Sequence, residues 1–221
     1  SSANGFSSSS SISGITVDDD SSIYVLDRNN ESIKKLNEGT WTGLEVTLPS
    51  NCYGIALHDS DIYVAGYSNY NILKNGSGFG DFKSADWGYL MPYDVAVDKS
   101  GNVYTVGSSS TTAKVLKYDG STWSSIVYHE SFSYPKGITV DDKGNVYVSD
   151  SNNKDIKMLP AGTKQWKTIG TGFNSPQGID VDNSGNVYVA DSGAIKVLTA
   201  GSSEWTAIPT DGTAGVTDVA V

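Results

Sequence analysis

The sequence contains few of the residues on which metal sites, disulfide frameworks and nucleophilic catalysis depend. Its 221 residues include one cysteine, Cys52, and two histidines, His58 and His129. A single cysteine excludes a disulfide within the chain. A zinc site needs three or four ligands brought together, and the two histidines stand in different copies of the repeat described below. We therefore predict no metal site and no cofactor.

Further absences narrow the classes of function. The sequence has no Gly-x-Ser-x-Gly segment and no phosphate-binding loop, so neither a hydrolase elbow nor a nucleotide site is indicated. With two histidines, a base aligned with one of the many serines is not expected. The sequence also has no run of about 18 apolar residues, the length of a transmembrane helix. We predict no catalytic residues and no insertion into a membrane.

Positive charge is scarce as well. The chain carries 15 basic and 25 acidic residues, which gives a net charge of −10. A protein with this balance repels phosphate backbones and anionic lipid surfaces at long range. The composition therefore argues against nucleic acid as a partner. The serine-rich N-terminus lacks the basic and apolar regions of a signal peptide, and we assign residues 1–13 to a Ser-rich segment or a single closing strand.

A repeat of about forty residues runs through the rest of the chain. It begins with glycine or aspartate, followed by an aliphatic residue, a variable residue and a second aliphatic residue. Six copies start near positions 14, 54, 94, 137, 178 and 218, so the spacings are 40, 40, 43, 41 and 40 residues. Periods of this length are typical of propellers and solenoids. We assign residues 14–221 to one repeat domain.

Each of the first five copies continues with three more β-rich segments. The second segment places tyrosine between aliphatic residues, or between valine and threonine in one copy, at residues 23–25, 62–64, 103–105, 146–148 and 187–189. Aspartate, asparagine and glycine fill the turns before it, as hairpins require. Four such segments predict a four-stranded antiparallel meander. Because its second strand carries bulk on both faces, the meander must be covered on both sides, which radial stacking achieves.

The fifth copy carries the clearest family signature. Residues 178–182 (Gly-Ile-Asp-Val-Asp), 185–191 (Gly-Asn-Val-Tyr-Val-Ala-Asp) and 195–198 (Ile-Lys-Val-Leu) resemble NHL repeats. The link at residues 198–202 is similar to those in the extracellular sensor propellers of bacterial receptor serine/threonine kinases. The resemblance covers residues 14–221 and implies an all-β propeller of NHL-like four-stranded blades, located outside the cell or at its surface. It says little about function, because NHL propellers host unrelated activities.

The strand count leaves the closure of the ring open. Five repeats are complete, and a partial sixth blade contributes one strand at residues 218–221. The chain could be an excerpt of a six-bladed protein, could close as five blades with the last strand on a neighbour's edge, or could take the missing strands from an adjacent molecule. An unpaired strand edge is a template for strand addition. Self-assembly is therefore an alternative function.

Aspartates offer hard oxygen ligands at two kinds of position. Clusters at residues 18–20 and 141–142 lie in hairpin turns, where aspartate serves the turn itself, and we favour that role over calcium binding. Asp180 differs, because its place in the first strand faces the central channel, where other copies have threonine or alanine. We include Asp180 among the candidate ligand-binding residues.

The strongest positive feature is one aromatic face. Loops that enter the first strand, and loops between the second and third strands, open on the same side of a propeller. The candidate ligand-binding residues in these loops are Tyr53, Tyr67, Tyr70, Trp87, Tyr93 and Tyr134. Rigid aromatic rings among adaptable polar groups are typical of recognition surfaces. The competing interpretation is that individual rings pack between blades.

These observations favour a non-catalytic extracellular binding or sensor propeller that recognises a protein or a glycan. A structural subunit that completes its open blade with a neighbouring chain is the alternative. A propeller lyase or lactonase is the least favoured, because Asp180 is the sole predicted chemical group in the channel.

Overall fold

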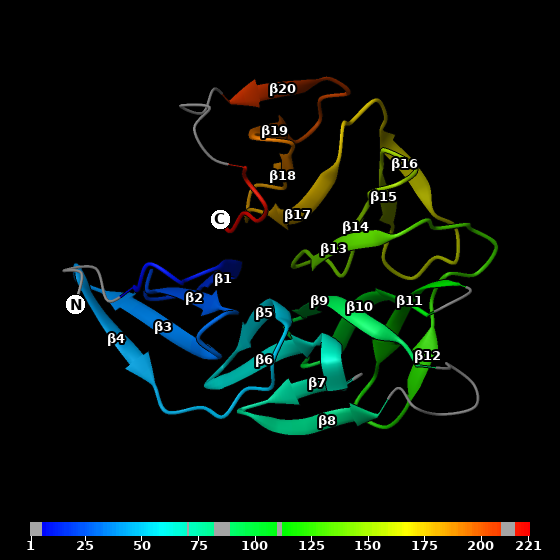
Figure 1. The fold of residues 1–221 in the computed structure, drawn as a ribbon. Helices are drawn as coiled ribbons and strands as arrows, with labels where there is room; N and C mark the ends of the chain where they lie inside the picture. The colour runs from blue at the N-terminus through cyan, green and yellow to red at the C-terminus, as the bar shows by residue number, and fades with distance from the viewer. Residues whose placement is uncertain (1–5, 70, 82–88, 110–111, 209–214) are drawn as a thin grey trace.

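Five four-stranded antiparallel sheets stand around a common centre like the blades of a propeller (Figure 1). The structure is a computed structural model and describes residues 6–69, 71–81, 89–109, 112–208 and 215–221. The predicted propeller with five complete repeats is confirmed. The one helical element in these ranges is the 3-10 turn η1 (Tyr67–Asn69). No helix in the described ranges is long and apolar enough to span a membrane.

Within each blade the strands pair in sequence order, with the first strand nearest the centre. The first blade contains β1 (Ile12–Val17), β2 (Ile23–Asp27), β3 (Ser32–Asn37) and β4 (Thr40–Leu44). The second contains β5 (Cys52–His58), β6 (Asp61–Gly66), β7 (Asn71–Lys74) and β8 (Ser77–Asp81). The third contains β9 (Met91–Val97), β10 (Val103–Ser108), β11 (Ala113–Tyr118) and β12 (Trp123–Ser125). The fourth contains β13 (Pro135–Val140), β14 (Val146–Asp150), β15 (Asp155–Leu159) and β16 (Lys167–Gly170). The fifth contains β17 (Pro176–Val181), β18 (Val187–Asp191), β19 (Ala194–Leu198) and β20 (Trp205–Ile208).

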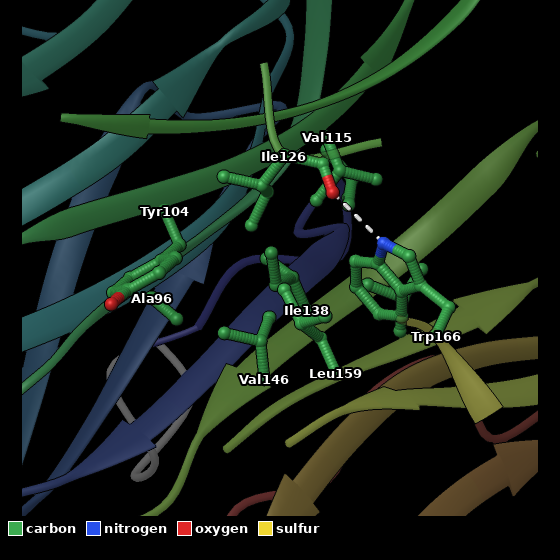
Figure 2. Packing of buried hydrophobic residues seen from close by; sticks show 10 residues of the cluster. Ala96, Tyr104, Val115, Ile126, Ile138, Val146, Leu159 and Trp166 are labelled. Atoms are coloured by element: carbon green, nitrogen blue, oxygen red, sulfur yellow. Dashed lines mark hydrogen bonds between the residues drawn. The ribbon is translucent and has the colours of Figure 1, made fainter. Parts of the chain in front are cut away.

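The alternation within the second strand decides how the blades pack. The tyrosine of that strand faces the following blade, and the aliphatic residues beside it face the preceding blade. Tyr104 of the third blade thus packs with Val146 and Val148 of the fourth (Figure 2). The indole of Trp166 closes this cluster and donates a hydrogen bond to the carbonyl of Ile126 at 2.8 Å. Because this cluster combines residues of two adjacent blades, the core lies between blades. Each such buried side chain stabilises the fold by about 1.5–3 kcal/mol.

The turn between the first two strands is built alike in blades three to five. Asp98 accepts the backbone N–H groups of Ser100 and Asn102 at 2.9 and 3.0 Å, and its second oxygen accepts the Asn102 amide and the Tyr104 hydroxyl at 2.7 and 3.0 Å. Asp141 and Asp182 repeat this arrangement. These hydrogen bonds occupy both carboxylate oxygens, which supports the turn role over calcium binding.

A phenylalanine–tryptophan–lysine cluster recurs in three blades. Its members are Phe6, Trp41 and Lys34 in the first blade, Phe132, Trp166 and Lys157 in the fourth, and Phe173, Trp205 and Lys196 in the fifth. In each cluster the two rings meet edge to face, with centroids 4.9 to 5.1 Å apart. The N-terminal segment therefore packs against the first blade through Phe6. Its described part, residues 6–11, forms no strand, and β1 begins at Ile12.

The C-terminal segment occupies a sixth position in the inner ring. Residues 215–221 lie near the centre, between β17 and β1 (Figure 1). The Gly178 N–H donates to the Thr217 carbonyl at 3.0 Å, and the Ile15 N–H donates to the Asp218 carboxylate at 2.9 Å. The segment thus bridges the fifth and first blades, which extends the six-copy repeat of the sequence to six positions in space.

Candidate functional site

One end of the central channel is lined by a ring of equivalent residues. The residue just before the glycine or aspartate of each repeat lies there: Ser13, Tyr53, Tyr93, Lys136, Gln177 and Thr217. All six border one hollow of about 370 Å³, which we call the channel mouth. Because the inner strands share one register, residues about forty positions apart in the sequence meet at this opening.

Four tyrosines form a continuous row across blades two to four, which we call the tyrosine row. Tyr67 lies 5.3 Å from Tyr53 and 5.6 Å from Tyr93, and Tyr93 lies 5.0 Å from Tyr134, measured between ring centroids. These separations suit tilted and edge-to-face contacts. Four of the aromatic residues predicted to share one face therefore contact one another in a continuous row.

The four rings differ in how much surface they offer. Tyr93 is buried, its hydroxyl lies 3.0 Å from the Ser108 hydroxyl, and burial raises the pKa of its phenol. For Tyr93 the competing interpretation, a ring packed between blades, therefore holds. Tyr134 ends the row and is 40% exposed. Tyr93 holds the row in place, and Tyr134 presents it to solvent.

The tyrosine row separates the channel mouth from a second hollow at the same face. This side hollow has a volume of about 420 Å³ and is bordered by Tyr67, Tyr93 and Tyr134, with Phe132 and Asn152. Serines and threonines at residues 108, 109, 112 and 133, together with Met91 and Ala113, complete its wall. Both hollows therefore combine aromatic and small polar side chains, the mixture typical of adaptable recognition sites.

Two cations stack on the tyrosine row. The Arg28 guanidinium lies 5.1 Å from the Tyr53 centroid, and the Lys136 ammonium lies 5.2 Å from Tyr93 and 4.9 Å from Tyr134. Such distances allow cation–π attraction. Both side chains border the channel mouth. This opening therefore carries positive charge in a chain whose net charge is −10.

Carboxylates lie deeper in the channel and join neighbouring blades. Asp94 accepts the N–H of Ile138 at 2.9 Å, and Asp218 accepts that of Ile15 at 2.9 Å. Asp180 accepts the hydroxyl of Thr139 and the N–H of Val221, each at 2.9 Å. Each carboxylate also accepts the N–H of the residue that follows it. The oxygens of all three groups thus hold the ring together.

Removal of these carboxyl groups from water changes their titration. Burial raises the pKa of Asp218 to about 7, and the nearby charge of Asp180 acts in the same direction. Burial, together with the charge of Asp218, raises the pKa of Asp94 well above its usual range. Burial also raises the pKa of Asp180. The channel therefore carries less negative charge near neutral pH than three ordinary carboxylates would.

The structure brings together four of the seven candidate ligand-binding residues, namely Tyr53, Tyr67, Tyr93 and Tyr134. Tyr70 and Trp87 lie outside the described residues. Asp180 faces the channel as expected, but it borders a separate hollow of about 200 Å³, further along the inner strands. Asp180 therefore does not contact the tyrosine row.

Sequence reasoning did not single out Lys136, Gln177, Thr217 and Ser13, nor the two further channel carboxylates. The signal for the mouth residues was their shared place before the head of each repeat. The signal for Asp94 and Asp218 was aspartate in the third and sixth copies where the other copies have glycine. Only the closed ring shows that these positions face the channel.

No group of three or more His, Cys, Asp or Glu side chains in the described ranges is arranged to hold a metal ion. His58 lies 3.6 Å from Asp59 in the turn before β6. Cys52 is buried, and burial raises the pKa of its thiol to about 12. A thiol with so high a pKa is a poor nucleophile at neutral pH.

Two repeat families match parts of the sequence. The NHL repeat model matches residues 132–157 and 173–194, which cover parts of the fourth and fifth blades. A β-propeller repeat model matches residues 86–112, in the third blade. No curated protein sequence matches the chain.

Solved structures of similar architecture include a chain of a protein complex and two lyases. A chain of a nidogen/laminin complex is 17% identical, with a TM-score of 0.81 over 96% of this chain and 85% of that one. A streptogramin B lyase is 20% identical, with a TM-score of 0.71 over 95% and 73%. A catalytically inactive virginiamycin B lyase from Staphylococcus aureus, with quinupristin, is 17% identical, with a TM-score of 0.72 over 98% and 76%. Identities this low show a shared fold only, so the function has to be argued from the residues of the site.

Proposed function

Because the chain is a β-propeller that carries NHL repeats, we propose that it is a non-catalytic binding module that recognises a protein or a glycan at its aromatic face. The observation that carries this proposal is the tyrosine row, which links two hollows across three blades. Fixed aromatic rings give large contact area at low entropic cost. The similar chain in the nidogen/laminin complex is a propeller found with a protein partner, which supports binding as a use of the fold.

The proposal extends to location. The repeat resembles the sensor propellers of bacterial receptor kinases, so we place the module outside the cell or at its surface. Detection of the protein in the cytosolic fraction of the producing cells, and not at the surface or in the medium, would contradict this part of the proposal.

The test compares two tyrosines of matched environment. Tyr134 and Tyr128 are 40% and 38% exposed, have φ of 57° and 55°, and each carries a lysine on its ring. Tyr134 ends the tyrosine row, whereas Tyr128 borders neither hollow. Ligands are first selected on glycan and peptide arrays with the unmodified chain. We expect Tyr134→Ala to weaken binding about tenfold or more, as loss of an exposed aromatic anchor does, and Tyr128→Ala to leave it unchanged. Equal effects of the two substitutions, or empty arrays, would contradict the proposal.

A lyase or lactonase activity has weaker support. Two of the similar structures are lyases, but the channel carboxylates of this chain already accept two or more hydrogen bonds each from the protein. A catalytic base needs an oxygen that can reach the substrate proton. Turnover of quinupristin by the purified chain would replace the binding proposal with an enzymatic one.

A second candidate function is assembly at the sixth position, outside the C-terminal segment of the inner ring, with strands of a neighbouring copy as the occupant. Two observations favour it. Tyr188 and Ile195 on the outward face of the fifth blade are half-buried, whereas their counterparts in the fourth blade, Tyr147 and Ile156, are buried by the following blade. Ile208 on the same face is 43% exposed.

The second observation concerns the hydrogen bonds of the tryptophan indole N–H groups. Trp166 and Trp205 donate their indole N–H groups to carbonyls in the outer part of the preceding blade, at 2.8 and 2.9 Å. Trp41 occupies the same place in the first blade, and its indole has no such acceptor among the described residues. A strand in the sixth blade would supply that carbonyl.

Light scattering over a range of concentrations tests the assembly. We expect a mass that rises with concentration in the unmodified chain and stays monomeric in Ile208→Asp, because a carboxylate on this face would oppose burial. Tyr128→Asp serves as the control. A constant monomeric mass of the unmodified chain would contradict assembly and leave the binding proposal intact.

A further inference from the structure

The channel mouth has two walls of different chemistry. Tyr53 of the second blade forms an aromatic wall, and the buried ring of Tyr93 from the third blade packs behind it. Ser13, Gln177 and Thr217, from the first and fifth blades and the C-terminal segment, form a wall of hydroxyl and amide groups. An aromatic face opposite small hydrogen-bonding groups suits a flat molecule that has one apolar face and many hydroxyls at its rim. A sugar ring has this form.

Among the residues that the structure describes, the cations at the mouth have no carboxylate partner. Lys157 and Lys196 also stack on aromatic rings, but each forms an ion pair as well, with Asp150 and Asp191 at 3.3 and 2.8 Å. Arg28, the sole arginine of the sequence, and Lys136 form no ion pair within the described part of the chain. The Arg28 guanidinium donates a hydrogen bond to the Ser11 hydroxyl at 3.3 Å.

The floor of the mouth does not neutralise these cations. Asp94 and Asp218 border it, but their oxygens are directed at backbone N–H groups of their own and the next repeat. Burial raises the pKa of both groups, so they carry less than full negative charge at neutral pH. The two cations are therefore available to bind an anion that enters from solvent.

We propose that the channel mouth binds an acidic sugar unit of a glycan, with the ring against Tyr53 and its carboxylate or sulfate between Arg28 and Lys136. This inference rests on the proposed function and names its ligand class. Arginine and lysine both bind carboxylates and sulfates through charge-assisted hydrogen bonds. A hollow of about 370 Å³ is at the lower end of the range of ligand sites, roughly 300–1,000 Å³, which suits one or two sugar rings of a longer chain.

The decisive probes are pairs of equal chain length, one acidic and one neutral. Calorimetry with the full chain compares a galacturonate tetrasaccharide with its methyl ester, and dextran sulfate oligomers with neutral dextran of equal length. We expect at least one acidic probe to bind about tenfold or more tightly than its neutral counterpart, with an affinity that falls as salt is added. A hexaglutamate peptide separates acidic sugars from acidic peptides.

Charge-removing variants locate the site. Arg28→Gln and Lys136→Gln are expected to weaken the acidic probe about tenfold each, and Lys136→Arg to retain most of the affinity. Lys164→Gln is the matched control, because Lys164 also stacks on a tyrosine, Tyr128 at 5.9 Å, but borders neither hollow. Circular dichroism verifies that all variants are folded.

The outcomes separate this inference from the proposed function. Equal binding of acidic and neutral probes, tighter binding of hexaglutamate, or no binding of either acidic probe at millimolar concentration would overturn the acidic-sugar inference. Array ligands whose binding still depends on Tyr134 would then keep the proposed function in place. Loss of affinity in Lys164→Gln equal to that in Lys136→Gln would overturn the inference too, because the charge effect would be non-specific.

Discussion

Ser21 shows how a single residue departs from an otherwise repeated turn. Gly101, Gly144 and Gly185 adopt φ of 78°, 82° and 85° in the hairpin turns of blades three to five. In the first blade this position is Ser21, with φ of 62°. A residue with a Cβ atom pays a conformational cost in this left-handed region, and glycine does not. Because the turn type is a local property, this cost can be predicted from the serine in the sequence.

Ser21→Gly should therefore stabilise the protein. We expect the free energy of unfolding in urea to rise by about 0.5–1 kcal/mol, since relief of the strain outweighs the entropy that glycine adds to the unfolded chain. Gly144→Ser is the reverse change at an equivalent turn, where the nearest atom to an added Cβ is Ala161 Cβ at 3.6 Å. It should destabilise by about 1 kcal/mol. A stabilising Gly144→Ser, or a destabilising Ser21→Gly, would show that φ does not control these turns.

The inner strand is the element on which the site depends. The glycine or aspartate that begins each repeat lies against the inner strand of the next blade, so both blades limit the space for its side chain. A Cβ atom on Gly54 would lie 2.6 Å from the Cα atom of Asp94, and one on Gly178 would lie 2.5 Å from that of Asp218. Glycine in one copy thus makes room for aspartate in the next. This pairing explains the glycines at positions 54 and 178, each of which precedes a copy that begins with aspartate.

Gly54→Ala should disturb this packing. The added methyl group meets backbone, which cannot turn away, so we expect a loss of about 2–3 kcal/mol in the free energy of unfolding. Gly43→Ala is the control, since Gly43 also lies in a strand but has no atom within 4 Å of its added Cβ. Urea titration of both variants measures the difference. A Gly54→Ala variant as stable as Gly43→Ala would show that the inner strands are not tightly packed.

At the scale of the whole molecule, the ring closes through residues that are far apart in the sequence. Asp218 of the C-terminal segment accepts the N–H of Ile15 in the first blade. Asp180 of the fifth blade accepts the N–H of Val221. The closure therefore depends on carboxyl groups in the channel and responds to their protonation.

The contribution of the ring closure to the free energy of unfolding should fall as the pH rises. Burial raises the pKa of Asp218 from 3.8 to about 7, so between these values the folded chain keeps a proton that the unfolded chain releases. Its contribution to stability is then fully present below about pH 4, falls as the pH rises toward 7, and stays low above that. We expect a difference of about 1–2 kcal/mol between pH 5 and pH 8, after allowance for water in the channel.

Asp218→Asn isolates this contribution. The variant loses one backbone hydrogen bond at every pH, but its stability should vary less between pH 5 and pH 8 than that of the unmodified chain. Urea unfolding at the two pH values measures both slopes. Identical slopes would show that Asp218 does not titrate in this range.

The number of complete blades, the strand positions and the turns could be predicted from the sequence, because each depends on residues that are close together in the chain. The period of about forty residues, the tyrosine of each second strand and the Asp–Gly turns are all local patterns. The aromatic face could be predicted as a set of residues on one side, because loop positions alternate regularly between the two ends of a meander.

The tertiary structure alone decided which of these residues meet. It placed Tyr53, Tyr67, Tyr93 and Tyr134 in one row and left Asp180 in a separate hollow. It also put Arg28 and Lys136 at the channel mouth without ion-pair partners in the described chain. These contacts join residues 14 to 43 positions apart in the sequence, most of them in different blades. The distance and angle between blades are set by side-chain packing across every interface of the ring, which no local pattern in the sequence contains.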